Sequence, residues 1–127
     1  MIFQYTLDAL LSGRKTQTRR VVKPNESAVQ AADGTITAVK VSGRTKWQVG
    51  KTYAVQPART AASVARIRLT EIHQEAATDI SEADAIAEGY DDRAGFIAGW
   101  HNVHGTGKDE VQVWVLHFAL EPPPTAE

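Results

Sequence analysis

The stretch "EVQVWVLHFAL", Glu110 to Leu120, decides the kind of fold that this 127-residue chain adopts. It is rich in β-branched and aromatic residues, which favour the pleated geometry of a strand. Its apolar residues fall on both faces of such a strand, and strands of this kind are buried on both sides. We therefore expect Val111 to Leu120 to form a central strand of a sheet.

Shorter strand patterns precede this segment along the chain. Residues 63–73 alternate apolar and polar side chains, which predicts a strand with one wet face. Residues 16–22 are rich in Thr and Val and also favour a strand. Residues 36–47, with "SGR" in the middle, predict a hairpin, and "WQVGKTYAVQP", residues 47–57, predicts a turn followed by a short strand.

Three segments have the pattern of short helices. "TLDALLSG", residues 6–13, places leucines at i, i+3 and i+4 and ends in glycine. "SEADAIAEG", residues 81–89, opens with a capping-box pattern, and "DDRAGFIAGWHNVHG", residues 91–105, stacks Phe96 on Trp100. Five or six strands with two or three short helices and no regular βαβ alternation predict a mainly β protein, built as a small closed or nearly closed barrel.

The length suits one domain, which we place at residues 1–121, and we expect "PPPTAE", residues 122–127, to be a disordered proline-rich tail. The absence of cysteine excludes disulfides and thiolate metal sites. No apolar run is long enough to predict a membrane span, and the first residues lack a signal-peptide pattern. These features predict a cytoplasmic protein.

The net charge of −1 hides a strong asymmetry between the two halves of the chain. Residues 1–70 hold 12 Lys and Arg against 3 Asp and Glu, whereas residues 71–127 hold 2 against 12. Such a pattern is typical of a basic surface that attracts an anionic or nucleotide-like partner. It fits equally well two halves that attract each other within one compact domain.

A cluster of basic residues and hydroxyls, "GRKTQTRRVV", Gly13 to Val22, is one of several pieces that together resemble a known family. In order along the chain, from about Leu7 to Leu120, the pieces are "LLSGRKTQTRR", "WQVGKTYAV", "ARIRLTEI", "ISEADAIAEGY", "FIAGW" and "VWVLHFAL". The chain resembles the ASCH (activating signal cointegrator homology) domains, which belong with the PUA-like barrels. The resemblance implies a PUA-like barrel with short flanking helices.

Within that family, the chain resembles the short bacterial branch that hydrolyses N(4)-acetylcytidine. That branch uses a lysine, a threonine three residues later and a glutamate before an aromatic helix, and the matching positions here are Lys15, Thr18 and Glu88. The resemblance implies a hydrolase that removes the acyl group from N(4)-acylated cytosine nucleosides, with Thr18 as nucleophile and with no cofactor and no metal. It implies a nucleoside as partner, with RNA as an open second partner, and no obligate protein partner.

Four further residues are expected to bind the substrate. Trp47 is a candidate for stacking on the base, as aromatic residues do in nucleic-acid sites. The other three residues would contact the polar groups of the substrate, and they are Arg14, Arg20 and Gln56. The preferred acyl group, the choice between free nucleoside and RNA, and the oligomeric state stay open.

The residues themselves place conditions on this site. Lys15 and Thr18 are three positions apart and would point to opposite faces of one regular strand, so the strand must begin after Lys15. Glu88 ends a predicted helix, where the helix dipole disfavours a negative charge and raises the carboxyl pKa. Neighbouring arginines would lower the pKa of Lys15 while Glu88 would raise it, so either residue is a candidate for the general base.

Two other functions use the same residues. A non-catalytic RNA-binding module needs only the basic half of the chain, and a ribonuclease would use Lys15 and the arginines to stabilise a phosphorane. His101 and His104 also raise the possibility of a metal site. Their i, i+3 spacing at a helix end offers no third ligand, and we predict none.

Overall fold

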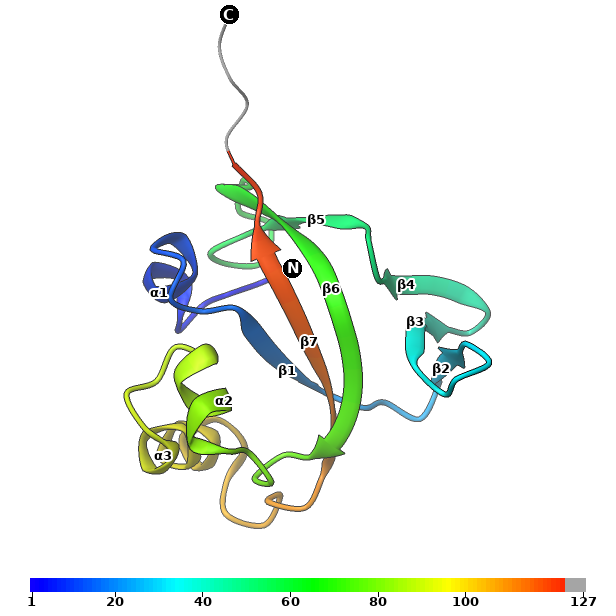
Figure 1. The fold of residues 1–127 in the computed structure, drawn as a ribbon. Helices are drawn as coiled ribbons and strands as arrows, with labels where there is room; N and C mark the ends of the chain where they lie inside the picture. The colour runs from blue at the N-terminus through cyan, green and yellow to red at the C-terminus, as the bar shows by residue number, and fades with distance from the viewer. Residues whose placement is uncertain (123–127) are drawn as a thin grey trace, which may run out of the picture.

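The computed structural model describes residues 1–122 and shows a mainly β protein of seven antiparallel strands and three short helices (Figure 1). The part of the predicted tail at residues 123–127 lies outside the described residues. In chain order the elements are α1 (Leu7–Leu11), β1 (Gln17–Val21), β2 (Glu26–Gln30), β3 (Ile36–Val41), β4 (Arg44–Gln48), β5 (Thr52–Val55), β6 (Ala65–Ala76), α2 (Glu82–Ala87), α3 (Arg93–His104) and β7 (Gln112–Leu120).

The final strand β7 is central, as predicted. It pairs with β1 on one side and with the long, curved β6 on the other (Figure 1). The sheet runs in the order β1-β7-β6-β3-β2, with β4 paired to β3 and β5 paired to β6. Within residues 1–122 the two ends of this path, β1 and β2, do not pair, so the sheet curls without closing into the full barrel.

The strand β2 is the element that the sequence patterns missed. It follows the break at Pro24-Asn25 and opens on Glu26, a residue with poor strand propensity. It forms because it pairs with β3, with Glu26 opposite Val41, and because the buried Glu26 carboxylate is fully hydrogen-bonded. Long-range pairing has here overridden local preference.

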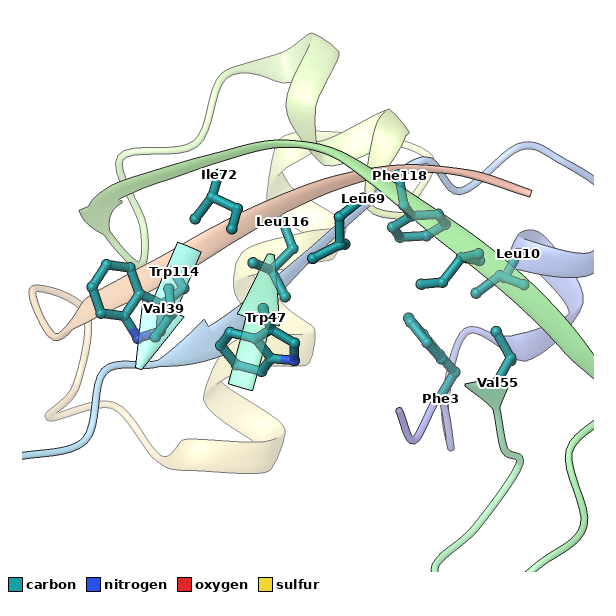
Figure 2. Close-up of a cluster of buried hydrophobic side chains, with 11 residues drawn as sticks. Phe3, Leu10, Val39, Trp47, Val55, Leu69, Ile72, Trp114, Leu116 and Phe118 are labelled. Atoms are coloured by element: carbon teal, nitrogen blue, oxygen red, sulfur yellow. The ribbon is translucent and has the colours of Figure 1, made fainter. Parts of the chain in front are cut away.

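Two apolar clusters explain why β7 is hydrophobic on both faces. Trp114 and Leu116 point to the larger cluster, which lies inside the curl of the sheet (Figure 2). Val113 and Val115 point the other way, where they pack under α2 and α3. The strand is therefore covered on both sides, as its composition indicated.

The three predicted helices are all present, each slightly shorter than its sequence pattern. The Ser81 hydroxyl accepts a hydrogen bond from the Asp84 amide at the start of α2, and Asp92 caps α3 in the same way through the Gly95 amide. No helix within residues 1–122 combines the length and hydropathy needed to cross a bilayer. The cytoplasmic location stays a prediction.

Candidate active site

A cavity of about 420 Å³ lies between β1, α3, the N-terminal segment and the turn that follows α2. This volume falls within the range of small-molecule sites. Charged and polar residues meet aromatic ones in its wall, which is formed by Ile2, Phe3, Gln4, Tyr5, Thr6, Lys15, Thr18, Arg19, Arg20, Val21, Glu88, Tyr90, Phe96, Gly99, Trp100, Val103 and His104. Three of these, Lys15, Thr18 and Glu88, are the predicted catalytic residues.

Lys15 and Thr18 reach the same cavity because β1 begins only at Gln17, as expected. The chain leaves α1 through Gly13, whose φ of 80° is a conformation that residues with side chains rarely adopt. The Lys15 amide then bonds to the Ala9 carbonyl at 2.9 Å, which fixes a bend before the strand. Both side chains are buried in this wall, so their position is set by the fold and not by solvent.

Glu88 is brought to Lys15 by the end of α2. It is the C-terminal cap of this helix, and the chain then turns at Gly89, where φ is 101°. A Cβ atom at Gly89 would lie 3.0 Å from the Cβ of Ala9, so only glycine lets the two helices approach this closely. The nearby Thr16 amide bonds to the Ala87 carbonyl at 2.8 Å and ties this turn to the start of β1.

The Lys15 amine and the Glu88 carboxyl form a buried pair, each with 4% of its side chain exposed. The Lys15 Nζ donates to the Glu88 backbone carbonyl at 2.6 Å and lies 3.4 Å from Glu88 Oε2. Burial lowers the pKa of Lys15, assisted by Arg20 and Arg19 and opposed by Glu88. Burial raises the pKa of Glu88 against the pull of the same cations. Both shifts favour the neutral forms of the pair.

Of the four predicted substrate-binding residues, only Arg20 lines this cavity. Its Nη2 donates to the Ile2 carbonyl at 2.8 Å and its guanidinium lies 5.1 Å from the centre of the Phe3 ring. Arg14 is exposed on the other side of the turn, where Nη2 donates to the Gly89 carbonyl at 3.3 Å. It borders a separate cavity of about 320 Å³.

Trp47 and Gln56 do not reach the cavity, and the expectation that they bind substrate needs correction. Trp47 lies on β4 with its ring in the larger apolar cluster, where it is 6% exposed (Figure 2). The Gln56 side chain donates to the Ala61 carbonyl at 2.8 Å and holds the loop after β5. Trp47 is buried because its strand faces the inside of the curled sheet.

The aromatic wall of the cavity comes instead from residues that the sequence analysis had not assigned to the site. The Tyr90 ring meets Phe96 edge-on at 5.5 Å, and Phe96 stacks on Trp100 at 6.5 Å. A Cβ atom at Gly99 would lie 2.9 Å from the Tyr90 hydroxyl, so this glycine makes room for the tyrosine. In the sequence analysis, the stacking of Phe96 on Trp100 was the one feature that indicated an aromatic cluster here.

Arg19 was also not assigned to the site, and it holds α2 against the sheet. Its side chain is 1% exposed, and it forms an ion pair with Glu75 on β6. A second carboxylate, Asp84 on α2, lies 3.9 Å away and also accepts a hydrogen bond from Gln17 at 3.3 Å. This network fixes the helix that carries Glu88.

The two histidines weighed as metal ligands have other partners. His101 Nε2 lies 2.8 Å from Asp109 Oδ1, and His104 packs on Trp100 with ring centres 4.0 Å apart. Among residues 1–122, no three His, Asp or Glu side chains gather closely enough to hold a metal ion.

The fold and cavity together define a curled, mainly β domain with a polar and aromatic cleft beside its edge strand. No family model matches the sequence, and no curated protein matches it. Solved structures do match. An ASCH domain from Lactobacillus crispatus JV V101 superposes with a TM-score of 0.60 at 17% identity, covering 93% of this chain and 74% of that one.

A protein from Enterococcus faecalis V583, described under the family model DUF984, superposes with a TM-score of 0.57 at 18% identity. The match covers 91% of this chain and 66% of that one. The chain therefore has the ASCH-domain fold that the sequence resemblance implied.

Proposed function

We propose that this protein is an amidohydrolase that removes the acyl group from N(4)-acylated cytosine nucleosides, giving cytidine and a carboxylate. One observation carries the proposal. Lys15, Thr18 and Glu88, which correspond to the residues of the N(4)-acetylcytidine hydrolases, line one cavity although Glu88 is 73 residues from Lys15. Hydrolysis of an amide needs a nucleophile, a base and an acid, and these three side chains supply one of each.

The hydrogen bonds of Lys15 favour it as the base. A neutral amine has two N–H donors and one lone pair, whereas an ammonium has three donors and no lone pair. Two donors suffice for the Glu88 carbonyl and Glu88 Oε2, the partners of Nζ in this structure. The lone pair is then free to accept the proton of the Thr18 hydroxyl, and burial lowers the pKa of Lys15 toward this neutral state.

In the first half of the reaction, Thr18 Oγ1 attacks the acyl carbon and its proton passes to Lys15. The bond from the acyl carbon to N4 then breaks, and the Glu88 carboxyl gives its proton to the leaving nitrogen. Burial raises the pKa of Glu88, which favours its protonated form as the acid of this step. The products of this half are cytidine and an acyl ester on Thr18.

In the second half, water attacks the ester. Its proton goes to the Glu88 carboxylate, the ester bond breaks, and Lys15 returns its proton to Thr18 Oγ1 as the carboxylic acid leaves. Both residues are thereby restored to their starting forms. In a full cycle Lys15 gains one proton and returns it, and Glu88 gives up one proton and regains it, so the pair acts as a single unit.

The cavity favours a nucleoside over a longer nucleic acid as substrate. Its volume suits one small molecule, and each of its two arginines is held by the protein through Nη2, Arg20 by the Ile2 carbonyl and Arg19 by Glu75. Aromatic side chains, among them Tyr90 and Trp100, are the surfaces on which a base ring packs well.

The test is to incubate the purified protein with N(4)-acetylcytidine, without added metal, and to follow cytidine and acetate by liquid chromatography. We expect both products in equal amounts, and none from the Thr18→Ala variant. An unmodified RNA ladder incubated in parallel should stay intact. Cleavage of the ladder, or binding of RNA with no release of cytidine from acetylcytidine, would replace this proposal with one of its rivals.

A further inference from the structure

The backbone of β1 presents two unpaired residues toward the cavity. In the pairing of β1 with β7, Thr18 lies opposite Leu116 and Arg20 opposite Trp114. The flanking bonds, from the Phe118 amide to the Thr16 carbonyl and from the Val22 amide to the Gln112 carbonyl, show that the even-numbered residues bond to β7.

The odd-numbered residues of β1 therefore direct their N–H and C=O groups to the opposite edge of the strand. That edge ends the sheet, because β1 is the last strand in the order of the described residues. Arg19 and Val21 both line the cavity. Among residues 1–122, neither backbone amide has a hydrogen-bond partner in the protein.

An unpaired strand edge normally pairs with another strand, but side chains of other elements lie beside this one. Phe96, Trp100 and Val103 of α3 line the same cavity, together with residues of the N-terminal segment. Arg19 is only 6% exposed. A small planar molecule fits this space, and a buried donor without a partner favours a ligand that supplies an acceptor.

We propose that this edge of β1 is the recognition site for the nucleoside itself, with the Arg19 amide donating to the acceptor edge of the pyrimidine ring, its N3 or O2. This inference rests on the proposed function. Thr18, the neighbour of Arg19 on the strand, fixes where the reacting N4 must lie. The Val21 amide, about 7 Å farther along the edge, then lies on the side of the ribose hydroxyls.

In this arrangement the backbone of β1 contacts N3 of the base. A backbone amide donates to N3 of a cytosine ring but meets an N–H at the same place in a uracil ring, so the site distinguishes the two at N3. The aromatic wall of Tyr90, Phe96 and Trp100 contributes packing that is indifferent to the base. Specificity therefore comes from the strand edge, and general affinity comes from α3.

Amide hydrogen exchange, measured residue by residue with NMR on isotope-labelled protein, tests this directly with cytidine as the probe. In the free protein the Arg19 and Val21 amides should exchange faster than those of Thr18 and Arg20, which bond to β7. Saturating cytidine should slow exchange at Arg19 by about tenfold or more, as expected for a new hydrogen bond. The even-numbered amides of the same strand serve as matched controls.

Three outcomes would overturn the inference: an Arg19 amide already as protected as Thr18 in the free protein, exchange at Arg19 that bound cytidine leaves unchanged, or no binding of cytidine at millimolar concentration. A kinetic measurement distinguishes failure of this inference from failure of the proposed function. N(4)-acetyl-3-deazacytidine, which lacks the N3 acceptor, should show kcat/KM about tenfold below N(4)-acetylcytidine.

Equal kcat/KM values for the two substrates would show that N3 makes no contact with the protein. The proposed amidohydrolase activity would be unaffected by this result. If neither substrate is hydrolysed but cytidine still protects Arg19, the proposed chemistry fails and the nucleoside site stands. The two proposals can therefore fail separately.

Discussion

Residues 1–122 contain two lysine–glutamate pairs with a buried carboxylate, and the pKa values of the two carboxyl groups differ. Glu88 with Lys15 lies in the cavity, and Glu26 with Lys46 lies beneath the β3–β4 hairpin, where the glutamate side chain is 0% exposed. The pKa of Glu88 is raised, whereas the pKa of Glu26 is lowered. Both glutamate side chains are almost inaccessible to solvent and both pair with a lysine, yet the pKa shifts are opposite, and Glu88 is the more deeply buried of the two.

The difference lies in the hydrogen bonds that each carboxylate receives. Burial raises the pKa of Glu26, but three donors outweigh it: the Lys46 ammonium at 2.7 Å, the Lys23 amide at 2.9 Å and the Trp114 indole at 3.1 Å. Among residues 1–122, the Glu88 carboxyl receives only the Lys15 amine, at 3.4 Å. A carboxylate with three donors is stabilised as an anion, whereas one with a single long contact tends to hold a proton.

Solvent adds to the contrast. Lys46 keeps a third of its side chain exposed to solvent, whereas Lys15 is 4% exposed. The Glu26 pair is therefore suited to stability and the Glu88 pair to proton transfer. For these two glutamates, deep burial with one long contact raises the carboxyl pKa, whereas three close donors lower it.

The largest expected effect separates the pairs by activity. Lys15→Met and Thr18→Ala should each lower kcat/KM for N(4)-acetylcytidine by about a thousandfold or more, because each removes a group that acts in every cycle. Lys46→Met, the matched control, should stay within about threefold of the wild type. Near-normal turnover in Thr18→Ala would show that water attacks the substrate directly and that no acyl-enzyme forms.

The next effect separates the pairs by stability. Glu26→Gln should lower the free energy of unfolding by about 1 to 3 kcal/mol, because the amide leaves buried donors without an acceptor. Glu88→Gln should lower the free energy of unfolding by a smaller amount, because the fold already disfavours the anionic form of Glu88. Urea unfolding of the two variants at neutral pH measures both values. A greater loss for Glu88→Gln would reverse the roles assigned to the pairs.

The pH dependence sharpens the comparison further. Glu26 has a lowered pKa, so its contribution to stability is present above its ordinary value of 4.5 and is lost as the pH falls through the folded-state pKa. Glu88 has a raised pKa, so its contribution is present below 4.5 and is lost as the pH rises through its folded-state pKa. The advantage of the wild type over Glu26→Gln should therefore shrink in acid, which unfolding curves between pH 3 and about pH 7 would show.

The activity should follow a bell-shaped pH profile for a related reason. Only the form of the Lys15–Glu88 pair with one shared proton has both a base and an acid, and the two limbs report the pair rather than either residue. Measurement of kcat/KM across the pH range, with Lys46→Met as control, tests this. A profile with a single rising limb and no fall at high pH would argue against Glu88 as the acid.

The smallest effects concern conservative and peripheral changes. Thr18→Ser keeps the hydroxyl and should retain part of the activity. Arg14→Ala should alter KM by no more than about threefold, because Arg14 lies outside the cavity and an exposed hydrogen bond contributes little. A large rise in KM for Arg14→Ala would show that the substrate extends past Gly89 onto the outer surface.

Several features of this protein were determined by its sequence alone. The apolar run before Leu120 produced the central strand, and the glycines at positions 13 and 89 ended α1 and α2 where expected. The spacing of Lys15 and Thr18 required a bend between them, and the strand indeed begins at Gln17. These features depend on neighbours within a few residues, which local patterns record.

Only the tertiary structure decided where the side chains meet. It added β2, left the sheet open, placed Trp47 in the core and brought Tyr90 and Arg19 to the cavity. The decisive contacts join residues far apart: 73 positions separate Lys15 from Glu88, and 88 separate Glu26 from Trp114. The donors that surround a carboxylate, and hence its pKa, are set by such pairings, and no local pattern contains them.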